Sequence, residues 1–542
     1  MAHVRVEKVA AQGVLKTTDS PSHRAPPEAW TDASNVRIAA GVCSRFSGHS
    51  SVMGTPPIAP AHVLNIDNDG DSFWLYAQAA GASSKVYVFN SGVHTDISQG
   101  AGYTVTDYRL WNSCVFQGIP ILNFGNGVPQ YWANYLVATD LANLTAWPAA
   151  TTCKVLRAFG NYLIALNITE SGVVYPHRVK WSDGAAPGTL PVTWDETDPI
   201  FEAGELDATD VEAGAIQDGL MLQDAFVVYK SGSTWLLRFI GGQQIMSLKP
   251  IHQASGILAA RCVCPVQPRR DRPELHFIKT DSDLGIFDTK SFVSVVEDRT
   301  RKWLEANIDS KNYANSFVFN NVAQSEAYFC FPESGETDPN IACVWNYVDN
   351  TVYFRDFVGV HAAAGVTEVA TAETWATILS TWETVSPAKW QESQRRKVVI
   401  ADQANTLLQQ FDSGLDFNGA AFTASLERRD LAVIGEDREG NPIVDYNARK
   451  LFSRIWPKIT GAAVRVQIGG AEVAGGDVTW GPEFTFNPAA GKRYIDCGVT
   501  DPTSSNVVPC NTPFMAIRFS STASAAWQLE GYGIDVEIGS EL

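Results

Sequence analysis

The chain has 542 residues, of which 45% are hydrophobic, 11% aromatic and only 18% charged. This composition excludes a disordered protein, and the length exceeds what one ordinary core holds, so we expect two to four domains or a large repeat architecture. The formal net charge of −18 argues against a general nucleic-acid-binding surface, because such a surface needs clustered cations. The charge suits a protein that lies near DNA without gripping it, or one that is simply soluble.

The nine cysteines are odd in number and scattered along the chain. Cys262 and Cys264 alternate in a predicted strand and lack the CxxC spacing of a metal or redox site. We therefore expect buried free thiols in a reducing compartment. The first residues lack the apolar core of a signal peptide, and no apolar run is long enough to span a membrane, so we expect synthesis in a cytoplasm.

Residues 1–58 are predicted to form an N-terminal arm with entry strands, held extended by Pro26-Pro27. From residue 59 the pattern becomes regular. Short β-branched and aromatic runs alternate with turns rich in Gly, Asn, Asp and Ser at a spacing of roughly 8–12 residues. This spacing and a loose internal repeat predict an all-β fold with a β-propeller-like body over 59–360, and stacked β-sandwiches are the alternative.

The stretch 177–256 carries the strongest hairpin pattern. We expect one strand in LMLQDAFVVY (220–229), a second in TWLLRFI (234–240) and a third after Gly241-Gly242. Between Trp181 and Tyr229 there are acidic residues but no Lys or Arg. A long loop of one charge sign is either a binding face or a surface that repels a partner.

Two segments break the strand rhythm. Residues 298–316 predict a short helix and a loop. Residues 361–415 are predicted to be an insertion or linker followed by returning strands, and the spacing of Trp375 and Trp382 would place both on one helix face. Residues 416–542 then hold enough alternating runs for a separate C-terminal β-rich, sandwich-like domain.

Catalytic and metal-binding signatures are missing from the sequence. It has no GxGxxG, GxxxxGK[ST], HExxH or GxSxG motif, and its histidines do not pair at metal-ligand spacing. Ser182-Asp183-Gly184 with Thr193-Trp194 is superficially similar to a sialidase turn motif, but the spacing is wrong. A propeller glycan hydrolase or depolymerase using the 195–198 carboxylates stays open as an alternative, as does a non-enzymatic propeller binding scaffold.

Four phrases of the sequence resemble the tail nozzle proteins of short-tailed bacteriophages, also called tail tubular protein B. They are PPEAWTDASNVRI (26–38), WNSCVFQGIPILNFGNGVPQYW (111–132), the stretch from HRVKWSD to FIGG (177–242) and MAIRFSSTASAAWQLEGYGIDVEI (515–538). They come in the family's order and are spread over most of the chain, but they are structural phrases rather than catalytic ones.

The resemblance implies a virion tail protein that assembles as a hexamer around a DNA-conducting channel below a tail adaptor ring. It implies no enzyme activity and no cofactor, only transient non-specific contact with phage DNA, and contacts with tail fibres or spikes and with the host cell surface. Like charge along a channel would keep DNA hydrated and mobile. The residues proposed to line the channel or an interface are Asp195, Glu196, Asp198, Glu202, Glu205, Asp207, Asp210, Glu212, Trp382 and Trp390.

Overall fold

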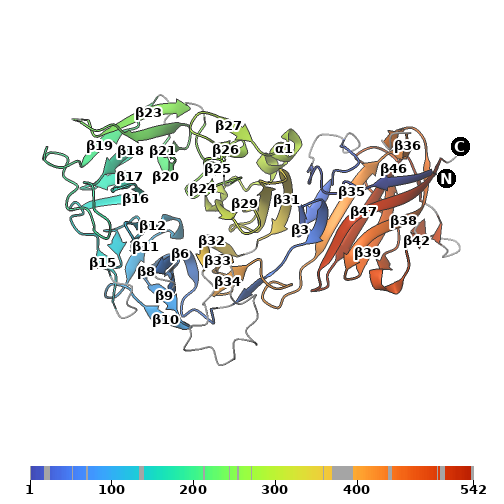
Figure 1. Ribbon diagram of the computed structural model, residues 1–542, viewed down its shortest axis with the longest axis horizontal. Helices are drawn as coiled ribbons and strands as arrows, with labels where there is room; N and C mark the ends of the chain where they lie inside the picture. The colour runs from blue at the N-terminus through green and yellow to red at the C-terminus, as the bar shows by residue number, and fades with distance from the viewer. Residues whose placement is uncertain are drawn as a thin grey trace, which may run out of the picture.

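The short apolar runs fold into antiparallel sheets along most of the chain, so the all-β prediction is confirmed. The computed structural model describes residues 2–538 except for gaps. The gaps are 17–24, 52, 69–70, 134–138, 211–213, 243, 253–254, 270, 358, 369–394, 438–441, 497–498, 501–506 and 509. Figure 1 shows two units side by side, a ring of small sheets and a layered block of long strands that holds both chain ends.

The ring consists of seven four-stranded sheets in the described part of the chain. From inner to outer strand, the first three are β6 (Pro60–Asn68), β7 (Asp71–Gln78), β9 (Val86–Asn90), β10 (Val93–Asp96); β12 (Asn112–Phe116), β13 (Ile119–Asn123), β14 (Gln130–Tyr131), β15 (Ala142–Asn143); and β16 (Thr151–Phe159), β17 (Tyr162–Glu170), β18 (Val173–Trp181), β19 (Gly204–Asp207). The next three are β20 (Ile216–Leu222), β21 (Ala225–Lys230), β22 (Thr234–Phe239), β23 (Met246–His252); β24 (Val263–Val266), β25 (Leu275–Lys279), β26 (Leu284–Phe287), β27 (Phe292–Ser294); and β28 (Phe317–Asn321), β29 (Glu326–Phe331), β30 (Ile341–Asn346), β31 (Thr351–Asp356). The seventh is β32 (Val360–Glu368), β33 (Arg395–Asp402), β34 (Leu407–Phe411), β5 (His49–Ser51).

The ring is a closed seven-bladed β-propeller. The inner strand of each sheet contacts the inner strand of the next, and β32 of the last sheet contacts β6 of the first. The outer strand of the seventh sheet, β5, comes from the N-terminal segment and pairs antiparallel with β34, where Phe411 lies opposite His49. Radial repetition of this kind leaves only short sheet edges. The propeller prediction is therefore confirmed, and the stacked sandwiches are excluded.

The fourth sheet contains one strand more than the sequence predicts for this stretch. The segment expected to form a single strand, 220–229, turns back at Gln223 and Asp224 between β20 and β21. Gln223 takes a positive φ of 57° there. The turn was missed because its two residues are neither Gly nor Asn, which are the usual signals for positive φ.

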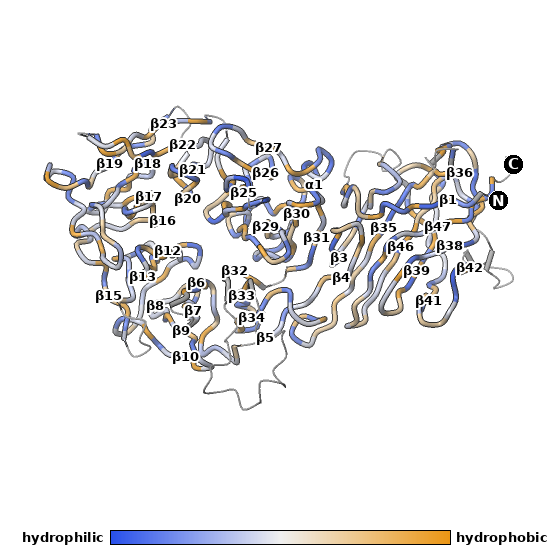
Figure 2. Tube along the Cα trace, viewed as in Figure 1, coloured by the Kyte–Doolittle hydropathy of each residue, from blue (hydrophilic) through white to orange (hydrophobic). Residues whose placement is uncertain are grey.

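The second unit is a β-sandwich built from both ends of the described chain. One sheet contains β1 (Ala2–Val6), β3 (Val36–Ala39), β4 (Val42–Arg45), β38 (Lys450–Gly461), β42 (Ile495–Asp496), β45 (Cys510–Thr512) and β47 (Trp527–Ile538). The other contains β2 (Asp32–Ser34), β35 (Ala424–Leu431), β39 (Val464–Ala471), β40 (Thr479–Trp480), β41 (Phe484–Phe486) and β46 (Phe514–Ser521). Figure 2 shows hydrophobic and hydrophilic residues alternating along these strands, which buries one face of each sheet.

These assignments place the predicted domain segments. The arm 1–58 contributes four strands to the sandwich and one to the propeller, so 416–542 forms the sandwich together with the arm. The described parts of 361–415 supply three strands of the seventh sheet. The Trp-rich part of this segment lies outside the described residues.

Three smaller two-stranded sheets and one α-helix complete the described structure. The sheets are β8 (Gly81–Ser84) with β11 (Tyr103–Val105), β36 (Val433–Glu436) with β37 (Pro442–Val444), and β43 (Val499–Thr500) with β44 (Val507–Val508). Helix α1 (Asp298–Asn307) confirms the helix predicted in 298–316, and Glu297 caps it by accepting from the Arg299 amide at 2.8 Å. No helix in the described ranges is long and apolar enough to cross a membrane.

Arg37 on β3 joins the sandwich to the propeller. Its Nε lies 2.5 Å from Glu326 Oε1, and its Nη2 lies 3.0 Å from Asp412 Oδ2. The fully buried Glu326 also accepts from the hydroxyls of Tyr328 and Tyr353, at 2.5 and 2.7 Å. Burial opposes the charge of Arg37, but the two carboxylates outweigh it and raise its pKa above the ordinary value. We call these five residues the junction network.

Candidate functional site

The acidic segment predicted to line a channel lies at the outer rim of the third propeller sheet. Glu205 and Asp207 belong to β19, the strand farthest from the axis in that sheet (Figure 1). The loop that holds Asp195, Glu196 and Asp198 connects β18 to β19.

Four of the predicted carboxylates form ion pairs with lysine or arginine: Glu196, Glu205, Asp207 and Asp210. On the register of β18 with β19, Arg178 faces Asp207 and Lys180 faces Glu205. Arg178 lies 2.9 Å from Glu205 and 3.1 Å from Asp207, and Lys180 Nζ lies 2.7 Å from Glu196. Such cross-strand pairs stabilise a sheet and cancel local charge. The burial of Glu196 opposes ionisation, but the Lys180 ammonium lowers the pKa of this carboxyl.

Asp210 and Glu202 are also engaged in local structure. Asp210 accepts from Lys230 Nζ at 2.6 Å and from Trp235 Nε1 at 3.2 Å, and Lys230 is fully buried. Glu202 accepts a hydrogen bond from the Tyr162 hydroxyl.

Asp195 and Asp198 are different, because neither forms an ion pair within the described residues; Asp195 is exposed and Asp198 is half-buried. Asp195 accepts from the Thr197 amide at 2.9 Å, and Asp198 accepts from the Ile200 amide at 3.0 Å. The hydrogen bonds from the Thr197 hydroxyl and amide lower the pKa of Asp195. Glu212, Trp382 and Trp390 lie outside the described residues.

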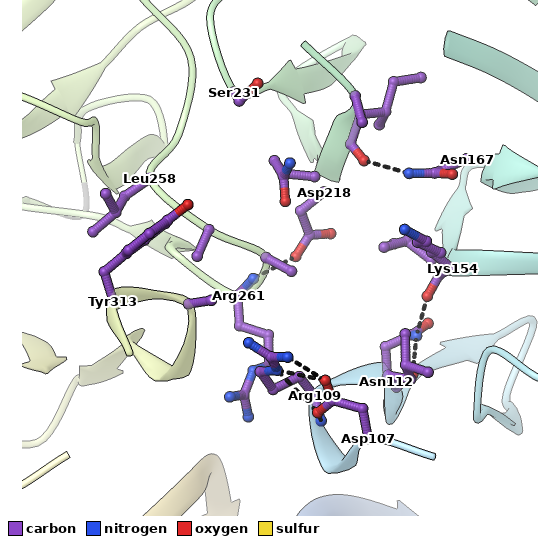
Figure 3. Close-up of a pocket in the computed structure, with 18 of the residues that line it drawn as sticks. Asp107, Arg109, Asn112, Lys154, Asn167, Asp218, Ser231, Leu258, Arg261 and Tyr313 are labelled. Carbon is purple, nitrogen blue, oxygen red and sulfur yellow. Dashed lines mark hydrogen bonds and ion pairs between the residues drawn. The ribbon is translucent and has the colours of Figure 1, made fainter. Parts of the chain in front are cut away.

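A polar cavity of about 290 Å³ lies where the inner strands β12, β20 and β24 begin, and we call it the axial cavity. Figure 3 shows that residues from several neighbouring sheets point into it. Its charged lining residues are Asp107, Arg109, Lys154, Arg157, Asp218 and Arg261. Four cations therefore face two carboxylates, an excess of two positive charges in a chain of net charge −18.

Arg157 and Asp218 form a bidentate ion pair in the axial cavity. Arg157 Nε lies 3.1 Å from Asp218 Oδ1, and Nη2 lies 3.0 Å from Oδ2. Asp218 also accepts from its neighbour's amide, Gly219 N, at 2.8 Å. Burial opposes the charge of Arg157, but Asp218 outweighs it and raises the pKa of the guanidinium.

Asp107 and Arg109 form a second ion pair in the lining of the cavity. Arg109 Nε donates to both carboxylate oxygens of Asp107, at 2.9 and 2.7 Å. Although burial works against ionisation, these bonds lower the pKa of Asp107. Both carboxylates of the cavity are thus engaged by arginines, and neither is free to act as a general base.

Arg261 is one of two cations of the cavity without a carboxylate partner of its own within the described residues, and Lys154 is the other. Its Nη1 donates to the His361 carbonyl at 2.8 Å, whereas Nε and Nη2 have no hydrogen-bond partner among the described residues. The guanidinium lies 5.5 Å from the Tyr108 ring centre and 5.6 Å from that of Phe317. Burial lowers the pKa of Arg261, because the opposing charges of its neighbours, Asp107 among them, do not compensate for the lost hydration.

The backbone holds Arg261 in a conformation that non-glycine residues rarely adopt, with φ of 68°. Its amide donates to Asp218 Oδ2 at 3.2 Å, and its carbonyl accepts from the Val318 amide at 2.9 Å. Such strain persists where the surroundings fix the chain, and it is common at functional sites.

The sequence analysis did not identify the axial cavity. Its residues come from separate sheets, so no spacing along the chain connects them. One signal was present, because Arg157 in KVLRAF and Arg261 in AARCVC each place a charge within or beside an apolar strand. A charge in that position is expected to have a buried role.

Cysteines and metal-type clusters give no competing site in the described part of the chain. The eight described cysteines are free thiols, as predicted, and Cys497 lies outside the described residues. Burial raises the pKa of Cys262, which lies beside Arg261, to about 12. The described residues contain no group of three or more His, Cys, Asp or Glu side chains arranged to hold a metal.

Comparison with known proteins gives only distant similarity in fold. The WD40 β-propeller domain of Doa1 has a TM-score of 0.35 and 9% identity, covering 68% of this chain and 96% of that chain. The WD40 domain of Neurospora crassa Pan2 has a TM-score of 0.34 and 8% identity, covering 69% and 97%. A glycoside hydrolase has a TM-score of 0.26 and 10% identity, covering 90% and 100%. The chain matches no protein-family model and no curated protein. The assignment of an all-β propeller with an attached sandwich therefore rests on the sheets themselves.

Proposed function

We propose that the chain is a structural virion protein that forms the distal tail tube, or nozzle, of a short-tailed bacteriophage. In this proposal six copies form a ring below an adaptor, retain the packaged DNA and conduct it at ejection. The proposal originates in the four phrases that resemble the nozzle family. Fold alone does not identify a function, so the placement of these phrases is the supporting observation.

The phrases lie where the two units are built and joined. Within 26–38, the Trp30 indole donates to the Val9 carbonyl at 2.7 Å. In the same phrase, Asn35 donates to Asp356 of the propeller at 2.6 Å and to the Thr423 carbonyl at 2.8 Å. The phrase 515–538 contains most of β46 and the whole of β47. Each of these strands is an interior strand of one of the two sandwich sheets. What resembles the family is thus the framework, as a structural role requires.

A DNA channel in such an assembly would lie between copies. The inner strands of one propeller contact each other all the way round, and the axial cavity of about 290 Å³ is far too small for a DNA duplex. This agrees with a ring in which each propeller is a solid wall segment.

The assembly is tested by mixing the purified chain with the adaptor protein encoded beside it and measuring particle mass and symmetry. We expect a six-fold particle. It should stay assembled on dilution, because ring contacts of obligate assemblies bury more than ~2,000 Å² each. A chain that stays monomeric beside a formed adaptor ring, or that releases sugars from a capsular polysaccharide, would contradict the proposal.

The electrostatic part of the proposal is tested at Asp195 and Asp198. Because neither carboxylate forms an ion pair within the described residues, Asp195→Lys with Asp198→Lys changes surface charge without breaking the ion pairs of Glu196, Glu205 or Asp207. If they line the channel, DNA ejection in vitro should slow and regain speed at higher salt.

The matched control is Asp224→Lys with Asp281→Lys, two other exposed carboxylates at strand turns, which adds the same charge at a different place. Equal ejection rates for the double variant, the control and the wild type would remove Asp195 and Asp198 from the channel.

A further inference from the structure

We propose that the axial cavity binds a doubly charged oxyanion of the phosphate type. The inference is independent of the nozzle proposal, because it uses only the charges and contacts of the cavity. An excess of two positive charges in a partly enclosed space disfavours the folded chain unless an anion neutralises it. A dianion matches this excess in magnitude.

The unpartnered N–H groups of Arg261 point to the same ligand chemistry. A buried guanidinium without hydrogen-bond partners at two of its nitrogens is costly, and the fork of a guanidinium fits the oxygens of a phosphate. Both nitrogens are covered by neighbouring atoms, so contact with an anion requires a turn of the side chain about its last torsions. In its present position the guanidinium lies near the rings of Tyr108 and Phe317, which supply no carboxylate.

Lys154 and Tyr313 complete the set of donors. Lys154 is exposed at the wall of the cavity, and its ammonium makes no ion pair within the described residues. Figure 3 shows the Tyr313 hydroxyl on the opposite side from Lys154. Lys154 and Tyr313 therefore add donors on two sides of the cavity, and Arg157 and Arg109 add positive charge although each is paired with a carboxylate.

The size of the axial cavity limits the ligand. A volume of about 290 Å³ lies at the lower end of the range for small-molecule sites, about 300–1,000 Å³. It admits free phosphate or the phosphate group of a compact molecule. The lining has no residue placed to cleave such a group, so we assign binding alone.

The test is isothermal titration calorimetry of the full chain with inorganic phosphate at pH 8 and fixed ionic strength. We expect saturable binding of one phosphate, weaker binding of acetate, and binding of sulfate comparable to phosphate. Glycerol 3-phosphate distinguishes the sources: tighter binding than phosphate identifies a phosphorylated small molecule, and weaker binding identifies the free ion. No saturable binding of phosphate or sulfate would overturn the proposal.

Variants assign the site within the chain. Arg261→Gln should weaken phosphate binding about tenfold or more, because it removes a charge-assisted donor. Lys154→Gln should weaken it severalfold, and it keeps the fold because the side chain is exposed. Arg238→Gln, at an exposed position on the outer part of the fourth sheet, is the matched control and should bind as the wild type does. If Lys154→Gln and a folded Arg261→Gln both bind phosphate as tightly as Arg238→Gln, the ligand lies elsewhere and the proposal fails.

Discussion

Arg37 and Arg261 are both largely but not fully buried, and they meet opposite surroundings. Arg37, between the sandwich and the propeller, contacts the carboxylates of Glu326 and Asp412, and its pKa is raised. Arg261, at the propeller axis, contacts one carbonyl and two aromatic rings, and its pKa is lowered. A buried charge with its partners inside the chain fixes the structure, whereas a buried charge without them is where an external partner is expected.

The largest effect should come from breaking the junction network at Glu326. Glu326→Ala leaves Arg37 with one carboxylate and removes the acceptor of the Tyr328 and Tyr353 hydroxyls. We expect a loss of about 3–5 kcal/mol in the free energy of unfolding, because one partner of a buried ion pair is removed. Urea denaturation followed by tryptophan fluorescence measures it.

The control is Glu472→Ala, which breaks the solvent-exposed pair with Arg449 and should change stability little. Glu326→Ala should also leave phosphate affinity unchanged. A stability equal to that of the Glu472 variant would show that the junction network does not hold the two units together.

The second effect, at Asp218, should lower stability but strengthen phosphate binding. Asp218→Asn removes the charge that faces Arg157 and raises the positive excess of the axial cavity from two to three. We expect a loss of about 2 kcal/mol in stability, together with tighter phosphate binding. Calorimetry and urea denaturation of the same preparation give both quantities. Weaker phosphate binding in a folded Asp218→Asn variant would contradict an electrostatic site.

The smallest effect concerns pH at His62, whose Nε2 lies 2.8 Å from Ser113 Oγ. Burial first, and then the charges of Arg261 and Arg157, lower the pKa of His62 to about 3. Below the unfolded value of 6.5 the unfolded chain binds the proton more readily. Stability from this group is therefore present at neutral pH and lost as pH falls from 6.5 toward 3, by up to about 1.4 kcal/mol per pH unit.

His62→Gln should flatten this part of the pH profile, measured as the difference in unfolding free energy between pH 7 and pH 5. The buried His276, whose pKa is lowered to about 4, contributes to both proteins and cancels in the comparison. Parallel pH profiles for the wild type and the variant would show that burial and the charges of Arg261 and Arg157 do not lower the pKa of His62.

The sequence predicts the propeller because its evidence is local. Alternation within each strand and turns at regular spacing can be recognised without knowing which strands pair. The role of the arm 1–58 depends on distant pairing, such as β1 with β47 and β5 with β34, which no local pattern encodes. The prediction of a bare acidic face did not include Arg178, Lys180 and Lys230, because these cations lie just outside the acidic run in sequence and opposite it in the sheets.

The axial cavity was harder to predict for a related reason. Asp107, Arg157, Asp218 and Arg261 come from four parts of the chain, and only the closure of the ring brings them together. The absence of catalytic motifs in the sequence gave no hint of a binding site, since anion recognition needs donors and an enclosed space rather than a motif.

The outer strand of the seventh sheet has a consequence for the order of folding. Strand β5 is synthesised early, but its partner β34 follows more than three hundred residues later, and β1 must wait for β47. At a synthesis rate of roughly 5–20 residues per second, these early strands stay unpaired for tens of seconds. Exposed strand edges invite pairing with other chains during that time. The ring can close only after β34 has been synthesised, and the sandwich only after β47. Both closures therefore have to precede assembly into any larger particle.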